Sequence, residues 1–315
     1  MKKKISVVLL GLVLVFVIAY LVVPTSTLFQ YMIGAERSIA GLKLQRLKTD
    51  TLEIEYLRGG TGTTLVLLHG FGADKDNWNR ISRYLTDHFD VLAIDLPGFG
   101  NSTSDMNLDY DVLTQVARLN EILNALDIET MHLAGNSMGG YIAGNYAAQF
   151  PEKVETLWLV SPLGVKNSET SEMFLAVKNG QNPAVLPRTE LEFQALFDFV
   201  FFEAPFIPET IIKHLASKAE ERVELNKKIF AQIHRMRDGE PQLDSALDLV
   251  LKSYNGPVLV SWGNKDRVLH VSGAETLKRV IPDAKISVMD NVGHLPMLES
   301  PKDTADVFLS FTSEQ

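Results

Sequence analysis

The sequence predicts an α/β fold with a mostly parallel sheet flanked by helices, a helical cap insertion and an N-terminal transmembrane helix. Short, wholly apolar segments alternate along the chain with helical patterns, as expected when helices cover both faces of a parallel sheet. One long internal segment, residues 163–254, interrupts this alternation and has helical patterns only. A charge-free apolar run, Ile5–Val23, follows three lysines at the N-terminus.

Residues 1–24 are predicted to be a membrane anchor. Nineteen uncharged residues, Ile5–Val23, would extend over about 28 Å as a helix, close to the hydrocarbon thickness of a bilayer. The segment Val22–Ser26 has no A-x-A cleavage site, so an uncleaved anchor is favoured over a cleaved signal peptide or a buried soluble helix. The lysines favour the cytoplasm, which predicts a single-pass protein whose larger part lies on the extracytoplasmic, periplasmic side.

Residues 25–43 are predicted to be a juxtamembrane segment, with a short interfacial helix around Phe29–Ile39. Residues 44–162 and 255–315 are predicted to form the α/β core. Leu44–Leu47 and Leu52–Leu57 are expected to form an entry hairpin. The other expected strands of the core are short apolar segments, and they are Leu65–Leu68, Val91–Ile94, Met131–Ala134, Leu157–Val160, Val258–Trp262 and Ile286–Met289. The expected helices between them are Tyr110–Leu126, Met138–Phe150, Gly273–Val280 and Thr304–Phe311.

Residues 163–254 are predicted to be a helical cap or lid, with helices over Thr189–Phe202 and Pro208–Arg237. This segment holds eight of the sixteen phenylalanines. They could fill a small core of the cap or line an apolar pocket at the end of the sheet. The candidate substrate-binding residues are Phe174, Phe197, Phe201, Phe202 and Leu295.

The segment Gly135–Gly139 matches the pattern G-x-S-x-G, directly after a predicted strand and at the start of a predicted helix. In that setting a strained turn lifts the serine hydroxyl above the end of the sheet. Ser137 is therefore the predicted catalytic nucleophile. The alternative is a glycine-rich turn whose serine has no chemical role.

A serine nucleophile needs a base and a carboxylate that orients the base. His294 follows the last predicted strand and is preceded by a glycine that permits a tight loop. Asp266 follows the strand Val258–Trp262, which gives the chain order Ser, Asp, His. Asp283 and Asp290 are the fallback candidates for the acid.

The negative charge that develops on the attacked carbonyl oxygen needs two backbone N–H donors. Met138 follows the nucleophile directly and is the first candidate. Phe71 is the second, because the segment His69–Gly72 follows the first apolar strand of the core. The alternative is that these residues only form a turn.

Residues 44 to 311 resemble the α/β-hydrolase fold, and are most similar to monoacylglycerol lipases of the α/β-hydrolase domain-containing protein six type and to related bacterial lipases. The segments that carry this resemblance are His69–Trp78, Asp95–Ser102, Gly135–Gly140, Trp262–Leu269 and Val271–Ala274. The resemblance implies hydrolysis of carboxylic esters, with acylglycerols favoured. The mammalian enzyme faces the cytosol, whereas the N-terminal lysines here predict the opposite side.

The predicted function is therefore that of a serine esterase or lipase that cleaves monoacylglycerols or other lipid esters through an acyl-enzyme, with no metal or organic cofactor. The alternatives are a carbon–carbon bond hydrolase of ring-cleavage products and a non-catalytic hydrolase-like binding module. The net charge of −9 and pI of about 5.3 argue against a nucleic acid partner. The absence of cysteine excludes disulfides and thiol catalysis. The expected partners are the ester substrate and the membrane, and no obligate protein partner is expected.

Overall fold

The computed structural model of the chain describes residues 23–315 except 239 and 244. The predicted anchor, residues 1–24, therefore lies almost entirely outside the described residues. Within the described part of the chain, no helix is both long and apolar enough to cross a membrane.

The core is an eight-stranded sheet with the order β1-β2-β4-β3-β5-β6-β7-β8. The first three strands in that order pair antiparallel, and the remaining pairs are all parallel. Each of the eight predicted strands is present, and their bounds are β1 (Lys43–Lys48), β2 (Glu53–Gly59), β3 (Thr64–Leu68), β4 (Asp90–Ile94), β5 (Met131–Asn136), β6 (Val154–Val160), β7 (Val258–Gly263) and β8 (Lys285–Met289). The predicted α/β class with a mostly parallel sheet is confirmed.

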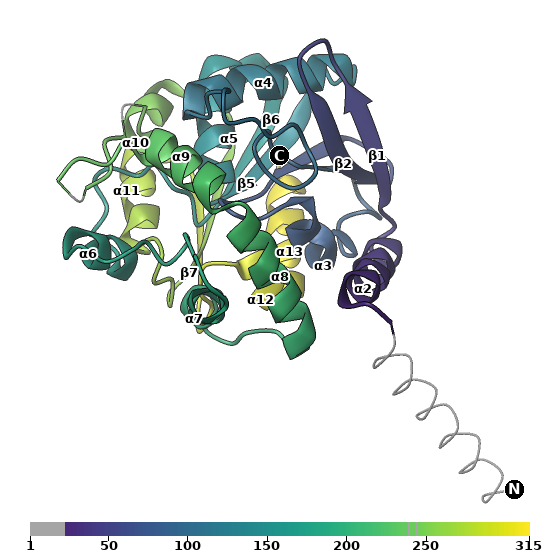
Figure 1. Ribbon diagram of the computed structural model, residues 1–315. Coiled ribbons are helices and arrows are strands. Elements are labelled where there is room, and N and C mark those ends of the chain that lie inside the picture. Colours follow the sequence, from purple (N-terminus) through teal and green to yellow (C-terminus); the bar gives the residue numbers. More distant parts are fainter. Residues whose placement is uncertain (1–22, 239, 244) are drawn as a thin grey trace, which may run out of the picture.

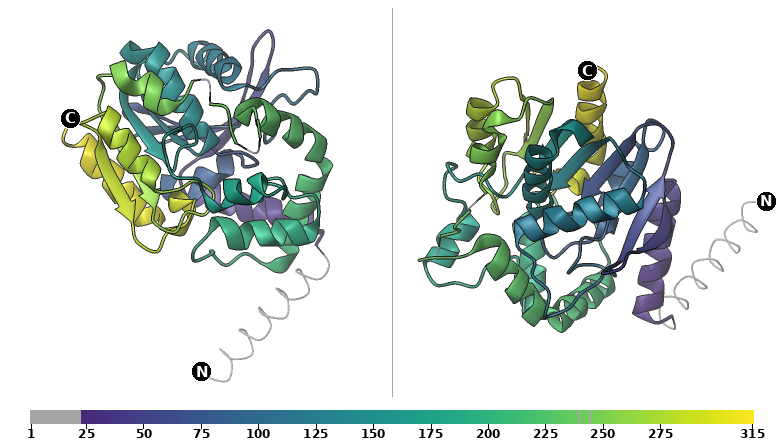
Figure 2. Two further views of the ribbon diagram at one scale, coloured as in Figure 1. Left: turned by 90° about the vertical axis from the view of Figure 1, so that its left-hand side faces the viewer. Right: turned by 90° about the horizontal axis from the view of Figure 1, so that it is seen from above.

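Helices cover both faces of this sheet (Figures 1 and 2). One apolar core lies beneath α4 (Val112–Ala125), α5 (Met138–Gln149) and α11 (Ser272–Val280). A second core lies on the opposite face beneath α3 (Asn79–Ser82) and α13 (Pro301–Thr312). Alternate residues of β4 contribute to the two cores, which explains why the central strands are continuously apolar rather than alternating.

The chain between β6 and β7 is helical, and its described residues include no strand. Its elements are α6 (Glu172–Lys178), α7 (Glu190–Val200), α8 (Glu209–Glu221), α9 (Val223–His234), α10 (Leu247–Val250) and the 3₁₀ turn η3 (Leu251–Ser253). We call residues 163–254 the cap, and its exact limits as a domain stay a prediction. Cap and core meet at the ends of the strands, where His294 N–H donates to Val200 O at 2.7 Å and Phe230 packs on Phe71.

Two details of the cap differ from the sequence prediction. The helical pattern over Pro208–Arg237 forms two helices, because the chain turns at Arg222 between α8 and α9. The Arg222 guanidinium donates to the carbonyl of Gly98 in the core. The helix predicted to end at Phe202 ends at Val200, since the carboxylate of Glu299 accepts the Phe202 amide at 3.2 Å. Contacts with the core therefore decide where these helices end.

The helix predicted around Phe29–Ile39 is present as α2 (Thr25–Ile39) and begins four residues earlier. It lies against both the core and the cap (Figure 1). Glu36 pairs with Arg80 of α3 at 3.2 Å, and the Phe29 ring lies 5.3 Å from the His214 ring of α8. The remaining short elements are the 3₁₀ turns η1 (Lys75–Trp78) and η2 (Pro151–Lys153) and the one-turn helix α12 (Pro296–Glu299).

Candidate active site

Ser137 occupies the turn between β5 and α5 in a strained backbone conformation. Its φ is +54° and its ψ is −116°, a region that residues with a side chain rarely adopt. The turn is held on both sides, because the Ser137 N–H donates to Val160 O at 3.0 Å and the Ser137 carbonyl accepts the Tyr141 N–H at 3.0 Å. The sharp reversal puts the serine at the carboxyl end of β5.

The two glycines of the G-x-S-x-G pattern are required by close packing around this turn. A Cβ atom at Gly135 would lie 2.2 Å from the carbonyl oxygen of Gly139, and one at Gly139 would lie 2.2 Å from that of Leu68 on β3. Backbone atoms cannot yield to such contacts, so larger residues would displace the turn. The pattern therefore has a physical cause in the packing of α5 on β5 and β3.

His294 and Asp266, from the loops after β8 and β7, are hydrogen bonded. Nδ1 of His294 lies 2.8 Å from Oδ2 of Asp266, and both side chains are buried. The carboxylate also accepts the N–H groups of Val268 and Leu269 at 2.8 and 2.9 Å and the indole N–H of Trp262 at 3.0 Å. Because the carboxylate is an acceptor for all of these groups, Nδ1 of His294 carries a proton and donates it.

Asn136 links the serine turn to the histidine loop. Its side-chain amide donates to the carbonyls of Val160 and His294, each at 3.2 Å, and the residue is fully buried. The ends of β5, β6 and the loop after β8 therefore meet at this amide. Sequence reasoning did not select Asn136, although an amide at the end of an otherwise apolar strand was a signal for it.

The two candidate donors to the oxyanion belong to segments that lie next to the serine. Met138 is the first residue of α5, and its side chain is fully buried. Phe71 lies in the turn after β3, next to Gly70. Gly70 packs closely on the serine turn, because a Cβ atom added to it would lie 3.3 Å from the Ser137 Cβ. The Phe71 ring packs edge-on against Phe99 at 5.6 Å and Phe230 of the cap at 5.7 Å.

The predicted substrate-binding residues do not gather in a single pocket. Phe201 and the half-exposed Phe202 line a cavity of about 400 Å³ that also borders Asp266. Phe197 packs on Phe201 at 5.6 Å, and the buried Phe174 packs on His234 at 5.8 Å inside the cap. Leu295, next to His294, is partly buried against both apolar cores.

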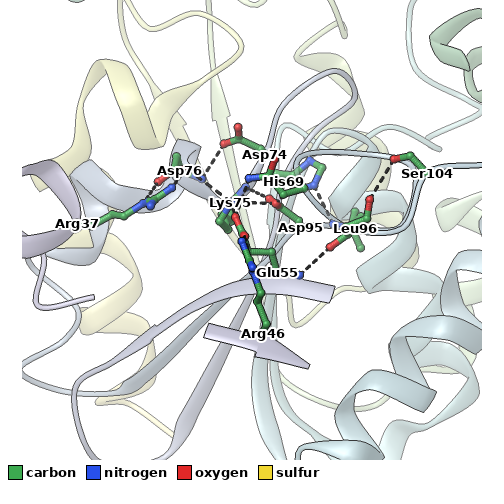
Figure 3. Close-up of polar contacts among 12 residues, drawn as sticks. Arg37, Arg46, Glu55, His69, Asp74, Lys75, Asp76, Asp95, Leu96 and Ser104 are labelled. Carbon is green, nitrogen blue, oxygen red and sulfur yellow. Dashed lines mark hydrogen bonds and ion pairs between the residues drawn. The ribbon is translucent and has the colours of Figure 1, made fainter. Parts of the chain in front are cut away.

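A cluster of buried charged groups lies beside the Phe71 turn, and sequence reasoning missed it (Figure 3). Its centre is Lys75, which is 1% exposed and lies 2.9 Å from the carboxylates of both Glu55 and Asp95. Burial acts to lower the pKa of Lys75, but Asp95, Asp74 and Asp76 outweigh it and the pKa is raised. Burial, together with Asp76 and Asp95, raises the pKa of Asp74 to about 7.

Residues 63–301 match the family model described as alpha/beta hydrolase fold. The chain belongs to the α/β-hydrolase fold family. Among its α/β-hydrolase relatives, "Lipase 3" of Moraxella sp. (strain TA144) is 34% identical over 90% of this chain and 88% of that protein. Human "Monoacylglycerol lipase ABHD6" is 27% identical over 95% of this chain and 90% of that protein.

The same architecture occurs in solved structures of α/β hydrolases. A bacterial membrane phospholipase A, described as a virulence factor, superposes with a TM-score of 0.87 and 39% identity, over 100% of this chain and 99% of that one. These similarities confirm the resemblance drawn from the motifs. This α/β hydrolase is thus an enzyme of the lipase and esterase type.

Proposed function

We propose that the protein is a serine hydrolase of lipid carboxylic esters, with Ser137 as nucleophile, His294 as base and Asp266 as the orienting acid. The observation that carries this proposal is the 2.8 Å hydrogen bond between His294 Nδ1 and Asp266 Oδ2, at the sheet end where the strained Ser137 turn stands. The bond fixes the proton on Nδ1 and leaves Nε2 to act as the base.

The proposed reaction runs in two steps. Nε2 of His294 takes the proton of the Ser137 hydroxyl as its oxygen attacks the ester carbonyl carbon, and the N–H groups of Phe71 and Met138 bind the oxyanion. The C–O bond to the alcohol then breaks, and His294 returns the proton to the departing alcohol. Water, activated by His294, then hydrolyses the acyl-enzyme, so that the products are one acid and one alcohol.

The proposed substrates are monoacylglycerols and other lipid esters. The names of the relatives, a lipase, a monoacylglycerol lipase and a membrane phospholipase A, support an acyl ester of a lipid. The apolar side chains of the cap near the sheet end give an acyl chain a surface to bind. We assign this role to Phe174, Phe197, Phe201 and Phe202 of the cap, together with Leu295, which lies beside His294 in the core.

The nucleophile can be tested with Ser137→Ala. We expect turnover of p-nitrophenyl butyrate and of monoacylglycerols to fall by a factor of about 10³ or more, because no attacking oxygen remains. A fluorophosphonate probe should label the wild type and leave this variant unlabelled. The matched control is Ser310→Ala, an exposed serine on α13, which should keep both properties. Labelling of Ser137→Ala, or wild-type protein that resists the probe, would contradict the proposal.

We also propose that residues 5–23 anchor the enzyme in the membrane as a single span, with the catalytic domain on the periplasmic side. The uncharged run and the preceding lysines support this. After alkaline carbonate extraction, the full chain should stay in the membrane pellet, and a chain that lacks residues 2–23 should move to the supernatant. A full chain released by carbonate would rule out the span.

A further inference from the structure

The turn that carries Phe71 is held at its beginning by His69. The turn closes with the Ala73 N–H donating to Gly70 O at 3.3 Å, and Gly72 takes a φ of +72° that favours glycine. Nδ1 of His69 donates to the same Gly70 carbonyl at 2.8 Å, and Nε2 accepts the Leu96 N–H at 3.0 Å. Burial lowers the pKa of His69, so the imidazole is neutral and can serve as donor and acceptor at once.

The end of the turn is held by the buried charges. Lys75 donates its backbone N–H to Asp95 Oδ1 at 2.8 Å and its ammonium to Asp95 Oδ2 at 2.9 Å. Asp95 directly precedes Leu96, the residue that binds His69. The two ends of the Phe71 turn are therefore fixed to the same short segment after β4, which leaves the Phe71 amide little freedom to move.

A further contact ties this arrangement to α2. The Arg37 guanidinium binds the carboxylate of Asp76 through two hydrogen bonds, with Nε at 2.7 Å and Nη2 at 2.6 Å (Figure 3). The two side chains are only 15% and 11% exposed, so water screens this pair weakly. Asp76 in turn donates its N–H to Asp74 at 2.9 Å, one residue after the turn.

The charges explain why Arg37 matters to this segment. The carboxylates of Asp74, Asp76 and Asp95 lie around the one ammonium of Lys75, and each acts to raise its pKa. Arg46 pairs with Glu55 at 3.0 Å on one side of the cluster, and on the side of α2 Arg37 compensates Asp76 with paired hydrogen bonds. Without it, Asp76 would compete with Asp95 for Lys75, from which it already lies 3.8 Å away.

We infer that Arg37 of α2 is a positioning residue that acts through Asp76 and Lys75 to hold the Phe71 amide at the oxyanion. The inference rests on the proposed function, because it concerns the donor that serves the transition state. Through Arg37, the helix that follows the proposed anchor contributes to turnover as well as to attachment.

The test compares Arg37→Ala with Arg37→Lys in the full chain, in detergent, with p-nitrophenyl butyrate. Removing an oxyanion donor costs about 10² to 10³ in rate, so a displaced donor should cost about 10-fold in kcat with KM changed less than about 2-fold. Arg37→Lys keeps the charge and loses the paired geometry, so part of the rate should return.

The inhibition constant of a transition-state analogue distinguishes positioning of the oxyanion donor from a merely structural role of Arg37. An alkyl trifluoromethyl ketone adds the serine oxygen to its carbonyl and leaves an oxyanion, so its inhibition constant should rise by the same factor as kcat/KM falls. The matched control is Glu36→Gln on the same helix, which breaks the pair with Arg80 but not the contact with Asp76. It should change kcat and the inhibition constant by less than about 2-fold.

Other results would overturn the inference. One is an Arg37→Ala enzyme that melts like the wild type and keeps its kcat and its inhibition constant. Another is an equal fall in kcat for Arg37→Ala and Glu36→Gln, which would mean general loosening of α2. If Arg37→Ala does not fold, Arg37→Lys decides by the same two constants. Failure of the proposed function would instead show in the wild type, as absent probe labelling.

Discussion

Asn136 shows how one side chain can connect two parts of a reaction site. Its side-chain amide donates to the carbonyls of Val160 and His294. Among the described hydrogen bonds, only this one joins His294 to β5. The side-chain oxygen Oδ1 of Asn136 is buried without a hydrogen-bond partner among the described residues. It faces Gly70, where an added Cβ would lie 2.9 Å from it. The residue before the nucleophile thus lies between the histidine loop and the turn after β3.

Replacing Asn136 with alanine should reduce activity more than stability. The unmade hydrogen bonds should lower the free energy of unfolding by about 1–3 kcal/mol, and loss of the tie to His294 should lower kcat by about 10-fold. Urea unfolding and steady-state kinetics measure the two effects.

The control for this prediction is Asn145→Ala. Asn145 is also buried, and its amide donates to the carbonyls of Tyr141 and Ser245 at 2.9 and 3.1 Å within the α5 region. It should lose similar stability and keep its kcat. Equal losses of kcat in the two variants would mean that Asn136 does not position His294.

At the scale of elements, the sheet was predictable because its strands are buried on both faces. Burial on both faces requires continuous apolar runs, and these mark the central strands β3 to β7, whereas the outer strands β1, β2 and β8 carry charged residues and are more exposed. The candidate site residues follow from the same logic, since Ser137 comes directly after β5, and Asp266 and His294 lie in the loops that follow β7 and β8. The pattern brings these loops to one edge, and the assignment of roles to the three residues stays a prediction.

The cap and the charged cluster were not predictable in the same way. The end of α7 depends on Glu299, which is 97 residues away from the Phe202 amide it accepts, and the break at Arg222 depends on Gly98. Arg37 and Asp76 are 39 residues apart and have no pattern in common. Pairings of this kind are set by how the finished elements pack, so a local pattern does not contain them.

At the scale of the whole molecule, one charged cluster joins four elements. Glu55 lies on β2, Asp95 follows β4, Lys75 and Asp76 lie in η1, and Arg37 lies on α2. Neutral and charged states of its carboxyl groups therefore affect the contact between the sheet and the helix next to the proposed anchor. The stability of the fold should depend on pH through this cluster.

The raised pKa of Asp74 determines whether stability rises or falls with pH. Burial first, and then Asp76 and Asp95, raise its pKa from 3.8 to about 7, while Lys75 acts in the opposite direction. Between these two values the unfolded chain releases the proton and the folded chain keeps it. The contribution of Asp74 to the free energy of unfolding is therefore complete below about pH 4 and falls as the pH rises towards 7.

Asp74→Asn should remove this fall, because asparagine does not titrate and can still accept the Asp76 N–H that Asp74 accepts at 2.9 Å. Urea unfolding of both proteins at pH 5 and pH 8 measures the effect, and the variant should gain stability relative to wild type at the higher pH. Asp50→Asn, at an exposed carboxylate between β1 and β2, serves as the control and should follow the wild-type profile. Parallel profiles for wild type and Asp74→Asn would mean that Asp74 is already ionised in the folded protein at pH 5, so that Lys75 outweighs burial at this position.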